Sequence, residues 1–452
     1  MISMSLSKAA TAMNANLIGE DTNFTGCNTD TRTIKQGNLF IALSGDNFDG
    51  HDFVAKAEES NAAALLLEKE VTHTKPILQV ENTRRAMGLL AKSWREELSI
   101  PLVAITGSNG KTTVKEMVSS ILAGIAEVHA TAGNYNNDIG VPLTLFGLDR
   151  NHQYAVIEMG ANHPGEIEWL SSIAQPNVAV ITQCAPSHLE GFGSIEGVAK
   201  AKAEIYSGLQ SNGTAIINAD DDYADYWKET CKHLNQFSFG ISNQSANVTA
   251  KNILALTEQN AIQFELHCSD ESIEIMLPLS GEHNVMNALA AAACCLSLDV
   301  SLQIIKAGLE KMTAVKGRLQ VKTGKHGSRI IDDTYNANPK SLNAAINVLN
   351  KYSGSRYLIL GDMGELGESA IEHHIEAGKL ARSAGIDGLF CIGELSLNTK
   401  QSFGEGAVHF DSYEELEKTL LDLLANNATL LVKGSRYMQM DRVVNMLTEE
   451  QS

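Results

Sequence analysis

The chain has 452 residues, of which 44% are hydrophobic and 20% are charged, and its formal net charge is −19. This length exceeds what one hydrophobic core usually serves, so we expect two to four domains of a folded protein. The negative charge argues against nucleic acid or an acidic membrane as a partner. We expect a cytoplasmic protein, because the sequence shows no secretion signal, no apolar run of about eighteen residues and no disulfide framework among its seven cysteines.

The first hundred residues predict a small α/β domain. Helices are expected at 7–17, 51–59 and 83–98, and strands at 37–43 and 62–67. Thr31 and Arg32 lie just before the first of these strands. They are candidates for holding a diphosphate or a uracil, and a structural ion pair is an equally good interpretation of Arg32.

A glycine-rich loop at 106–113 is the strongest functional signal. It follows an apolar strand at 101–105 and precedes a helix at 114–122. In this context glycines let backbone N–H groups converge on a phosphate, while a lysine and a threonine serve the phosphates and a magnesium ion. Ile105 stands where the usual pattern has its first glycine, and an ordinary turn with an exposed lysine is the alternative. We expect a nucleoside triphosphate to be bound by Gly107, Ser108, Asn109, Gly110, Lys111, Thr112 and Thr113.

Polar side chains also follow the next predicted strands. Glu158 ends the strand at 154–157, and His188 lies in the loop after the strand at 177–182. Open parallel sheets bind their ligands at this edge. Glu158 is a candidate magnesium ligand or a helix cap, and His188 is a candidate ligand or an ordinary loop histidine.

Lys202 lies on the apolar side of a helix predicted at 194–209. Glu196, Lys200 and Glu204 form the charged side of that helix, four residues apart. Lys202 therefore either extends its amine to solvent or is buried for a purpose. Burial favours the neutral amine, which reacts with a carbonyl group or with carbon dioxide.

A helix predicted after Gly281 carries Asn284 and Asn287 on one face of its first turn. Their amides are suited to the edge of an adenine, and helix capping is the alternative, mainly for Asn284. From Gly317 onward, strands and helices alternate again, which predicts another parallel sheet. His373 and His374 are expected to be exposed on a charged helix of this region.

Taken together, residues 106–113, Glu158, His188, Lys202, the segment 283–287 and Gly317-Arg318 resemble the Mur ligases, the ATP-dependent amide-forming enzymes of peptidoglycan synthesis. The resemblance covers essentially the whole chain. The loops at 333–339 and 361–367 are similar to those of the member that adds D-alanyl-D-alanine to UDP-N-acetylmuramoyl-tripeptide. The Asp-Asn-Pro motif with which the tripeptide-forming member holds its amino acid is absent.

The resemblance implies an α/β protein of three domains. Residues 1–99 would bind the UDP-sugar, residues 100–314 would bind ATP around a P-loop ATPase-like parallel sheet, and residues 315–452 would be a Rossmann-like domain for the incoming dipeptide. A monomer without nucleic-acid or membrane partners is expected. The reaction would pass through an acyl phosphate and yield UDP-N-acetylmuramoyl-pentapeptide, ADP and phosphate.

The resemblance also implies roles for single residues. Lys111, His188 and Lys202 would be catalytic, with Lys202 carbamylated. Mg²⁺ would be held by Thr112, Glu158, His188 and Lys202. ATP would be bound by the loop together with Asn284, Asn287, Arg318 and Asp333. The two other substrates would meet Thr31, Arg32, Asn134, Asn136, Asn137, Asn336 and Asn338. Lys433 or Arg436, in the last loop of the chain, would also meet the incoming dipeptide.

Three other functions are compatible with the glycine-rich loop. A GTP-driven switch would need a guanine-reading Asn-Lys-x-Asp motif, which the sequence lacks. The tripeptide-forming synthetase and folylpolyglutamate synthase share the central site. The folate enzyme is not expected to carry the first domain.

Overall fold

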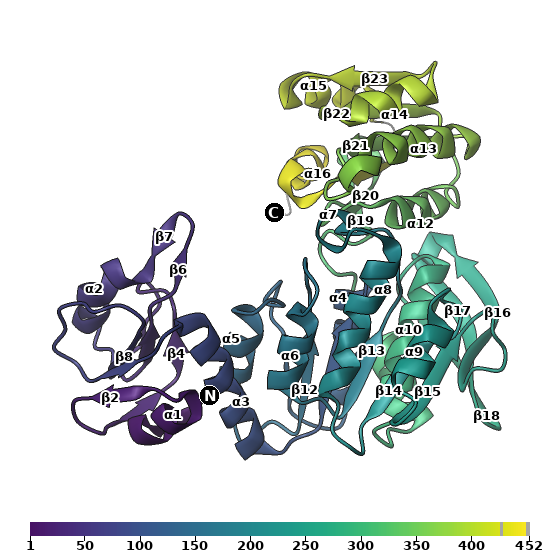
Figure 1. Cartoon of the computed structure of the whole chain (residues 1–452). Coiled ribbons are helices and arrows are strands. Elements are labelled where there is room, and N and C mark those ends of the chain that lie inside the picture. The colour runs from purple at the N-terminus through teal and green to yellow at the C-terminus, as the bar shows by residue number, and fades with distance from the viewer. Residues whose placement is uncertain (425–427, 449–452) are drawn as a thin grey trace.

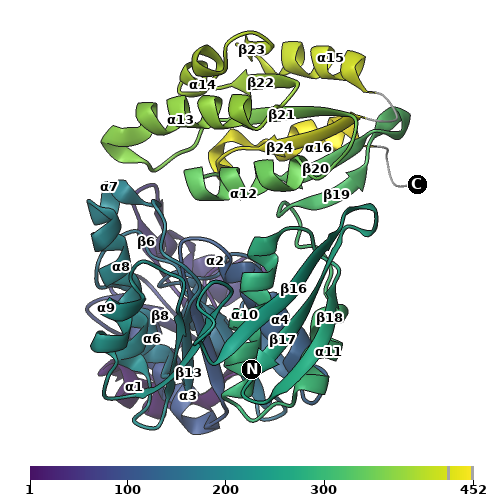
Figure 2. The ribbon, with the colours of Figure 1, turned by 90° about the vertical axis from the view of Figure 1, so that its right-hand side faces the viewer.

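In the computed structural model, which describes residues 1–424 and 428–448, the chain forms three successive α/β units. The first and the central unit lie side by side, and the third lies over the central one (Figures 1 and 2). Within the described residues no helix has the length and apolarity that crossing a membrane requires.

The first unit is built on a five-stranded sheet in the order β2-β9-β8-β5-β4, in which only the β2–β9 pair is antiparallel. Its central strands are apolar and fully buried, as expected for strands covered on both faces. Its elements are β1 (Ser3–Ser5), α1 (Leu6–Met13), β2 (Asn16–Ile18), β3 (Asn23–Thr25), β4 (Cys27–Asn28), β5 (Leu39–Ile41), β6 (Ser44–Gly45), β7 (Phe48–Asp49), η1 (Gly50–Phe53), α2 (Val54–Glu59), β8 (Ala64–Leu67), β9 (Ile77–Gln79) and α3 (Thr83–Leu98).

The central unit carries a nine-stranded sheet in the order β11-β12-β10-β13-β14-β15-β16-β17-β18. Its strands are β10 (Leu102–Thr106), β11 (Val128–Ala130), β12 (Tyr154–Glu158), β13 (Val178–Ile181), β14 (Thr214–Asn218), β15 (Asn235–Gly240), β16 (Val248–Leu256), β17 (Ala261–Cys268) and β18 (Glu271–Leu277). Its helices are α4 (Lys111–Leu122), α5 (Gly140–Phe146), α6 (Glu166–Ala174), α7 (Leu189–Phe192), α8 (Ile195–Ala203), η2 (Glu204–Gly208), α9 (Ala224–Thr230), η3 (Thr257–Gln259), α10 (Glu282–Leu296) and α11 (Leu302–Glu310).

Two apolar cores cover the two faces of the central sheet. One includes residues of the first unit as well as α6 and α8, so the first and central units share it. The other packs α4, α10 and α11 against the sheet. The pairing from β11 to β16 is parallel, as predicted, whereas β17 runs antiparallel between β16 and β18. Local pattern did not predict this antiparallel edge.

The third unit has a six-stranded sheet in the order β19-β20-β24-β21-β22-β23, parallel except at β19. Apolar cores lie on both of its faces. Its elements are β19 (Gln320–Thr323), η4 (Lys325–Gly327), β20 (Arg329–Asp333), α12 (Pro339–Leu349), β21 (Ser355–Gly361), η5 (Gly367–Ser369), α13 (Ala370–Ser383), β22 (Gly388–Ile392), α14 (Ser396–Phe403), β23 (Ala407–Phe410), α15 (Tyr413–Leu423), β24 (Ala428–Lys433), η6 (Arg436–Met438) and α16 (Asp441–Leu447).

Three local predictions need correction. The helix predicted at 7–17 ends at Met13, where Asn14 adopts a φ of +53°, and Asn16–Ile18 form strand β2. The helix predicted at 194–209 is α-helical only as far as Ala203 and then tightens into a 3-10 turn. His374 is fully buried rather than exposed, since its Nε2 accepts the backbone N–H of Met363 and its Nδ1 lies 2.7 Å from the carbonyl of Ala370. His374 therefore fixes the loop that follows β21.

Candidate active site

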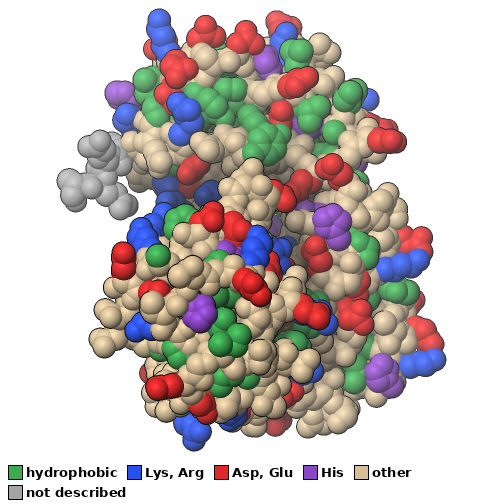
Figure 3. Space-filling view, turned by 60° about the vertical axis from the view of Figure 1, so that its left-hand side comes forward, with side chains coloured by type: hydrophobic (Ala, Val, Ile, Leu, Met, Phe, Trp, Pro, Cys, Tyr) green, Lys and Arg blue, Asp and Glu red, His purple; other side chains and the backbone are tan. Residues whose placement is uncertain are grey.

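A large cavity of about 1340 Å³ lies where the third unit covers the ends of the central strands. The space-filling view shows the hollow between the two parts of the molecule, with basic and histidine side chains near it (Figure 3). Single ligand pockets usually measure about 300–1,000 Å³, so this one has room for more than one substrate. Its walls include the glycine-rich loop, the start of α10 and the loops after β20, β21 and β24.

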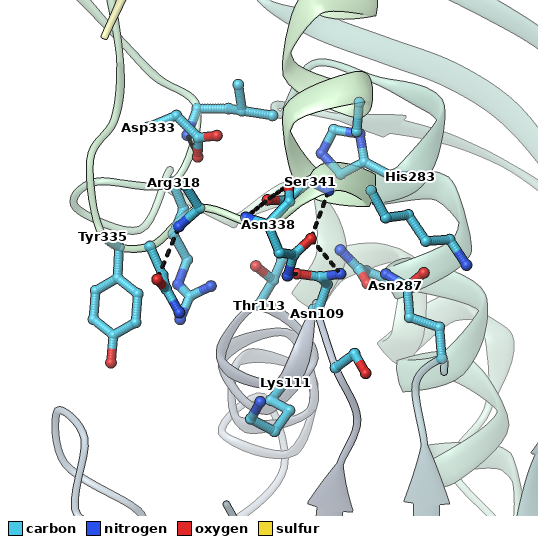
Figure 4. A pocket seen from close by; sticks show the side chains of 18 of the residues that line it. Asn109, Lys111, Thr113, His283, Asn287, Arg318, Asp333, Tyr335, Asn338 and Ser341 are labelled. Atoms are coloured by element: carbon cyan, nitrogen blue, oxygen red, sulfur yellow. Dashed lines mark hydrogen bonds between the residues drawn. The ribbon is translucent and has the colours of Figure 1, made fainter. Parts of the chain in front are cut away.

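The glycine-rich loop is held tightly between β10 and α4. A Cβ atom on Gly107 would lie 1.8 Å from the hydroxyl of Thr182, and one on Gly110, whose φ is +84°, would lie 2.4 Å from Oδ1 of Asn287. Only glycine fits both positions. The loop leaves the end of a buried strand and opens a helix, which is the arrangement that binds phosphates (Figure 4).

Lys111 and Glu158 lie on neighbouring parts of the same wall. The amine of Lys111 donates to the carbonyl of Gly107 at 2.7 Å, and burial lowers its pKa. Glu158 is 2% exposed; its Oε1 accepts from the amide of Asn136 at 2.9 Å. Its Oε2 is buried with no hydrogen-bond partner among the described residues. A buried carboxylate oxygen without a partner is costly unless it binds a cation.

Lys202 is buried. Its position on the apolar side of the helix allowed either burial or extension of the amine to solvent. Lys202 is 3% exposed, and no hydrogen bond or ion pair of its amine occurs within residues 1–424 and 428–448. Burial, with a further contribution from the charge of Lys111, lowers the pKa of Lys202 to about 7. Lys202 lines the cavity. Because its pKa is lowered to about 7, its amine is largely neutral near physiological pH.

His188 meets a carboxylate of the third unit. Its Nδ1 lies 2.7 Å from Oε2 of Glu365, and the backbone N–H of Leu189 donates to the carbonyl of Glu365 at 3.1 Å. Both His188 and Glu365 have positive φ, +51° and +62°. Strained backbone of this kind in non-glycine residues persists where tertiary contacts enforce it, often at functional sites. The His188 contact lowers the pKa of Glu365, and Lys111 adds to this effect.

The first turn of α10 brings two asparagines to the glycine-rich loop. Asn287 donates to Oδ1 of Asn284 at 3.1 Å, and Asn284 donates to the carbonyl of Ser280 at 2.8 Å. The helix is capped by Gly281 rather than by Asn284. Burial and the charge of Lys433 lower the pKa of His283, beside them, to about 4, so this imidazole is neutral at physiological pH.

The loop after β20 crosses from the third unit to the glycine-rich loop (Figure 4). The side-chain amides of Asn338 and Asn109 contact each other at 2.7 Å, and Asn338 also caps α12. Arg318 donates to the hydroxyl of Thr112 at 2.9 Å and lies over the ring of Tyr335. Polar side chains far apart in the sequence thus meet directly at this boundary.

Asp333 is held by a buried lysine. The amine of Lys433, which is 1% exposed, lies 2.5 Å from Oδ2 of Asp333 and donates to the carbonyl of Asn336 at 2.8 Å. The backbone N–H of Leu319 donates to the other oxygen of Asp333. Burial raises the pKa of Asp333, and Lys433 opposes that rise.

The predicted substrate residues fall into two groups. The cavity is lined by Asn134, Asn136, Asn137, Asn336 and Asn338. Thr31 and Arg32 lie apart from it, on the first unit. Arg32 is 80% exposed and pairs with Asp30 at 2.6 Å. This contact is the structural alternative considered for Arg32, and the pair does not line the large cavity.

Comparison with known proteins agrees with this geometry. The family models described as Mur ligase middle domain, Mur ligase glutamate ligase domain and Mur ligase catalytic domain match residues 105–295, 317–436 and 23–95. The chain is 43% identical over 453 residues to the UDP-N-acetylmuramoyl-tripeptide–D-alanyl-D-alanine ligase of Escherichia coli K12, covering 99% of each chain. The chain belongs to the Mur ligase family.

Solved structures resemble this Mur ligase over nearly its whole length. MurF from Acinetobacter baumannii superposes with a TM-score of 0.94 at 36% identity, covering 98% of each chain. MurF from Thermotoga maritima, solved in complex with ADP, superposes with a TM-score of 0.84 at 28% identity and covers 93% of this chain and 96% of its own. The three-part α/β fold expected from the sequence is confirmed.

Some residues of the site in this Mur ligase had no signal of their own in the sequence. Glu365 lies in a loop that only the folded third unit brings to the cavity. The buried His374 looked like part of a charged helix surface. An alternating pattern of strands and loops shows at which edge of the sheet such loops lie. It does not show which of their side chains points into the cavity.

Proposed function

We propose that this protein is the ATP-dependent ligase that joins D-alanyl-D-alanine to UDP-N-acetylmuramoyl-tripeptide in peptidoglycan precursor synthesis. The observation that carries the proposal is the single cavity in which Lys111, Glu158 and Lys202 face the loops of the third unit. The similarity to ligases of this name over the whole chain supports the same substrates. We also propose that the enzyme acts in the cytoplasm and as a monomer.

Each unit has one main substrate in this proposal, and the central unit also meets the peptide arm of the UDP-sugar. Residues 1–99 bind the UDP-sugar, with Thr31 and Arg32 at its diphosphate or uracil. Residues 100–314 bind ATP and, through Asn134, Asn136 and Asn137, the peptide arm. Residues 315–452 bind the dipeptide, with Asn336 and Asn338 facing it. Arg32 belongs to the first unit and does not line the large cavity, which fits an elongated substrate that reaches from the first unit to the central one.

ATP lies along the glycine-rich loop. The loop amides and Lys111 bind its β- and γ-phosphates, and Arg318 adds a second positive charge. Asn284 and Asn287, whose amides are buried at the start of α10, read the adenine. Asp333 accepts from the ribose hydroxyls, and Lys433 keeps its carboxylate oriented.

The residues of the cavity fit magnesium. Glu158 has a buried oxygen without a partner, and the hydroxyl of Thr112 lies beside the loop. Mg²⁺ takes few protein ligands and completes its shell with phosphate oxygens and waters. Among the described residues, no group of three or more acidic, cysteine or histidine side chains could hold a metal ion. A magnesium ion in this cavity would therefore need phosphate oxygens and waters as ligands beside the protein. When bound, the ion would neutralise phosphate charge. His188 and Lys202, which also line the cavity, would hold a second ion.

We further propose that Lys202 is carbamylated. Carbon dioxide reacts with a neutral amine, and burial keeps the Lys202 amine largely neutral. The product is an anion on a buried side chain, which needs a positive partner. Lys111 supplies one such charge, and a magnesium ion would supply more.

The chemistry follows from this arrangement. A carboxylate is a poor electrophile, so the terminal carboxylate of the tripeptide first takes the γ-phosphoryl group of ATP and releases ADP. Lys111 stabilises the negative charge that develops on the transferred group. The amine of D-alanyl-D-alanine then attacks the carbonyl carbon, the new C–N bond forms and phosphate leaves. The third unit, closed over the loop by Asn338 and Arg318, keeps water from the acyl phosphate.

Phosphate release tests the proposal. We expect ATP-dependent release only when UDP-N-acetylmuramoyl-tripeptide and D-alanyl-D-alanine are both present, with pentapeptide formed in equal amount. Release with a free amino acid on the dipeptide precursor would assign the protein to the tripeptide-forming step instead. Release with folate and glutamate would assign it to folylpolyglutamate synthesis.

A further inference from the structure

The acceptor dipeptide poses a recognition problem that the neutral side chains of Asn336 and Asn338 do not solve. D-Alanyl-D-alanine is a zwitterion, with an ammonium group at one end and a carboxylate at the other. Its two Cα atoms are about 3.8 Å apart, so the two charges lie roughly 6 Å apart. A site for it needs one carboxylate and one cation at that separation, and the carboxylate must lie at the phosphate end of ATP.

Glu365 is the carboxylate of the third unit that is not already held by a partner within that unit. The third unit contributes two carboxylates to the cavity walls, Asp333 and Glu365. Asp333 is occupied by Lys433 and by the backbone N–H of Leu319. Glu365 has a 55% exposed side chain that lines the cavity, and its carboxylate lies 2.7 Å from His188, beside the wall that carries the glycine-rich loop.

Arg436 is the matching cation on the neighbouring loop. It lines the same cavity, and within the described ranges 1–424 and 428–448 its guanidinium has no hydrogen bond or ion pair. The guanidinium lies 5.9 Å from the ring centroid of Tyr335. An arginine without a carboxylate partner in a ligand cavity is well suited to bind one from a ligand.

The two loops are fixed to each other. They follow β21 and β24, adjacent strands in which Leu360 pairs with Lys433. The backbone N–H of Gly364 donates to the hydroxyl of Ser435 at 2.7 Å, and the backbone N–H of Ser435 donates to the carbonyl of Asp362 at 2.9 Å. Neighbouring strands are about 4.8 Å apart, which is the scale of a dipeptide.

The loop that carries Glu365 is also braced from behind. The carboxylate of Asp362 accepts the backbone N–H groups of Ser396 and Leu395, at 2.7 and 3.2 Å. The backbone N–H of Met363 donates to the buried His374 at 3.0 Å. Glu365 therefore extends from a rigid base with positive φ, and that base is oriented toward the central unit.

From these contacts we propose that Glu365 and Arg436 together select the acceptor, Glu365 by binding its ammonium group and Arg436 by binding its carboxylate. The inference rests on the proposed function, because it assigns the ends of that function's own substrate. It places the amine beside His188 and the glycine-rich loop, where the acyl phosphate forms. Both residues position the acceptor and take no part in bond making.

Acceptor kinetics test Arg436. Wild type and Arg436→Gln are compared with D-alanyl-D-alanine and with its carboxamide, which lacks the terminal charge. A charge-assisted pair distinguishes such ligands by about tenfold or more. We expect that preference in kcat/KM for wild type and near equality for Arg436→Gln. Arg442→Gln, on α16 outside the cavity, should keep the wild-type ratio.

Glu365 is tested by the KM of each substrate. We expect Glu365→Gln to raise KM for D-alanyl-D-alanine about tenfold or more, with KM for ATP and for the tripeptide within about twofold of wild type. Glu365→Asp should recover part of the loss. Glu368→Gln, three residues away and outside the cavity walls, is the control.

The failure of this inference differs from that of the proposed function. If wild type forms pentapeptide while Glu365→Gln keeps its acceptor KM, or Arg436→Gln keeps its preference for the free acid, the acceptor assignment is wrong and the function stands. If wild type forms no pentapeptide from the two substrates, both are wrong. Unchanged KM for ATP shows that each variant is folded.

Discussion

Replacing Lys202 with methionine tests whether burial, rather than an unseen partner, sets the state of its amine. An amine with the ordinary pKa of 10.5 is neutral in roughly one molecule in a thousand at pH 7.5, whereas a pKa of about 7 leaves roughly three-quarters neutral. Burial thus raises the fraction of neutral amine, the form that reacts with carbon dioxide, by roughly 700-fold at pH 7.5. Methionine has a similar length and no charge, so it removes the amine and keeps the packing.

The same shift makes a stability prediction with a definite sign. Between pH 7 and 10.5 the unfolded state binds the Lys202 proton more tightly than the folded state, so wild type gains stability as pH rises through this window. The cost of burying the amine is on the order of 4 kcal/mol at pH 7 and about 2 kcal/mol at pH 9. In buffer free of carbon dioxide, Lys202→Met should therefore be the more stable protein at pH 7.

The measurement is urea or thermal unfolding of both proteins at pH 7 and pH 9. We expect the advantage of Lys202→Met to shrink by about 2 kcal/mol at the higher pH. Adding ¹³C-bicarbonate should then produce a carbamate resonance in wild type that Lys202→Met lacks, together with a large loss of ligase activity in the variant. A stability gap that is the same at both pH values would refute the burial argument, and full activity in the variant would refute the carbamate.

Further expectations concern the two walls of the cavity. Lys111→Met should lower kcat by about 10²–10³ with the fold intact, because it removes charge stabilisation of the transferred phosphoryl group; steady-state kinetics would show it, and wild-type turnover would contradict it. Gly110→Ala should raise KM for ATP, since the new Cβ would meet Asn287 at a φ of +84°, and an unchanged ATP affinity by calorimetry would contradict that packing. Lys433→Met should lower the free energy of unfolding by about 3–5 kcal/mol, because it leaves the buried Asp333 carboxylate without its partner. The loss should grow as pH rises and Asp333 ionises, and denaturant unfolding at pH 5 and pH 8 would measure that growth.

The parts of the site that the sequence predicted are those set by local geometry. A strand, a loop with glycine at positions 107 and 110 and a helix are enough to place backbone N–H groups around a phosphate, and no distant residue is needed. Helical spacing alone also put Lys202 on the apolar face of its helix, and it left burial and extension to solvent as alternatives. Its burial then followed from the packing of α8 against the sheet.

The parts that remained beyond prediction depend on contacts between distant segments. Glu365 contacts His188 from a distant part of the sequence, and no local sequence pattern predicts that contact. Lys433 likewise pairs with Asp333, which lies a hundred residues earlier in the sequence. The strand β17 reverses direction within a sheet whose other apolar segments look alike. The charge pattern around His374 indicated an exposed helix face, whereas the loop after β21 required a buried partner.

The contacts that close the third unit over the central one suggest what controls the reaction. They are mostly polar pairs between individual side chains, such as Asn338 with Asn109 and Arg318 with Thr112. Three of these residues, Asn109, Arg318 and Thr112, are also proposed to hold the nucleotide and its magnesium, and Asn338 is proposed to face the dipeptide. Binding ATP must therefore replace some of these contacts with contacts to phosphate, so the ligand itself becomes part of the interface. Closure that depends on bound substrates protects the acyl phosphate only when ATP, acid and amine are all present, which is when water must be excluded.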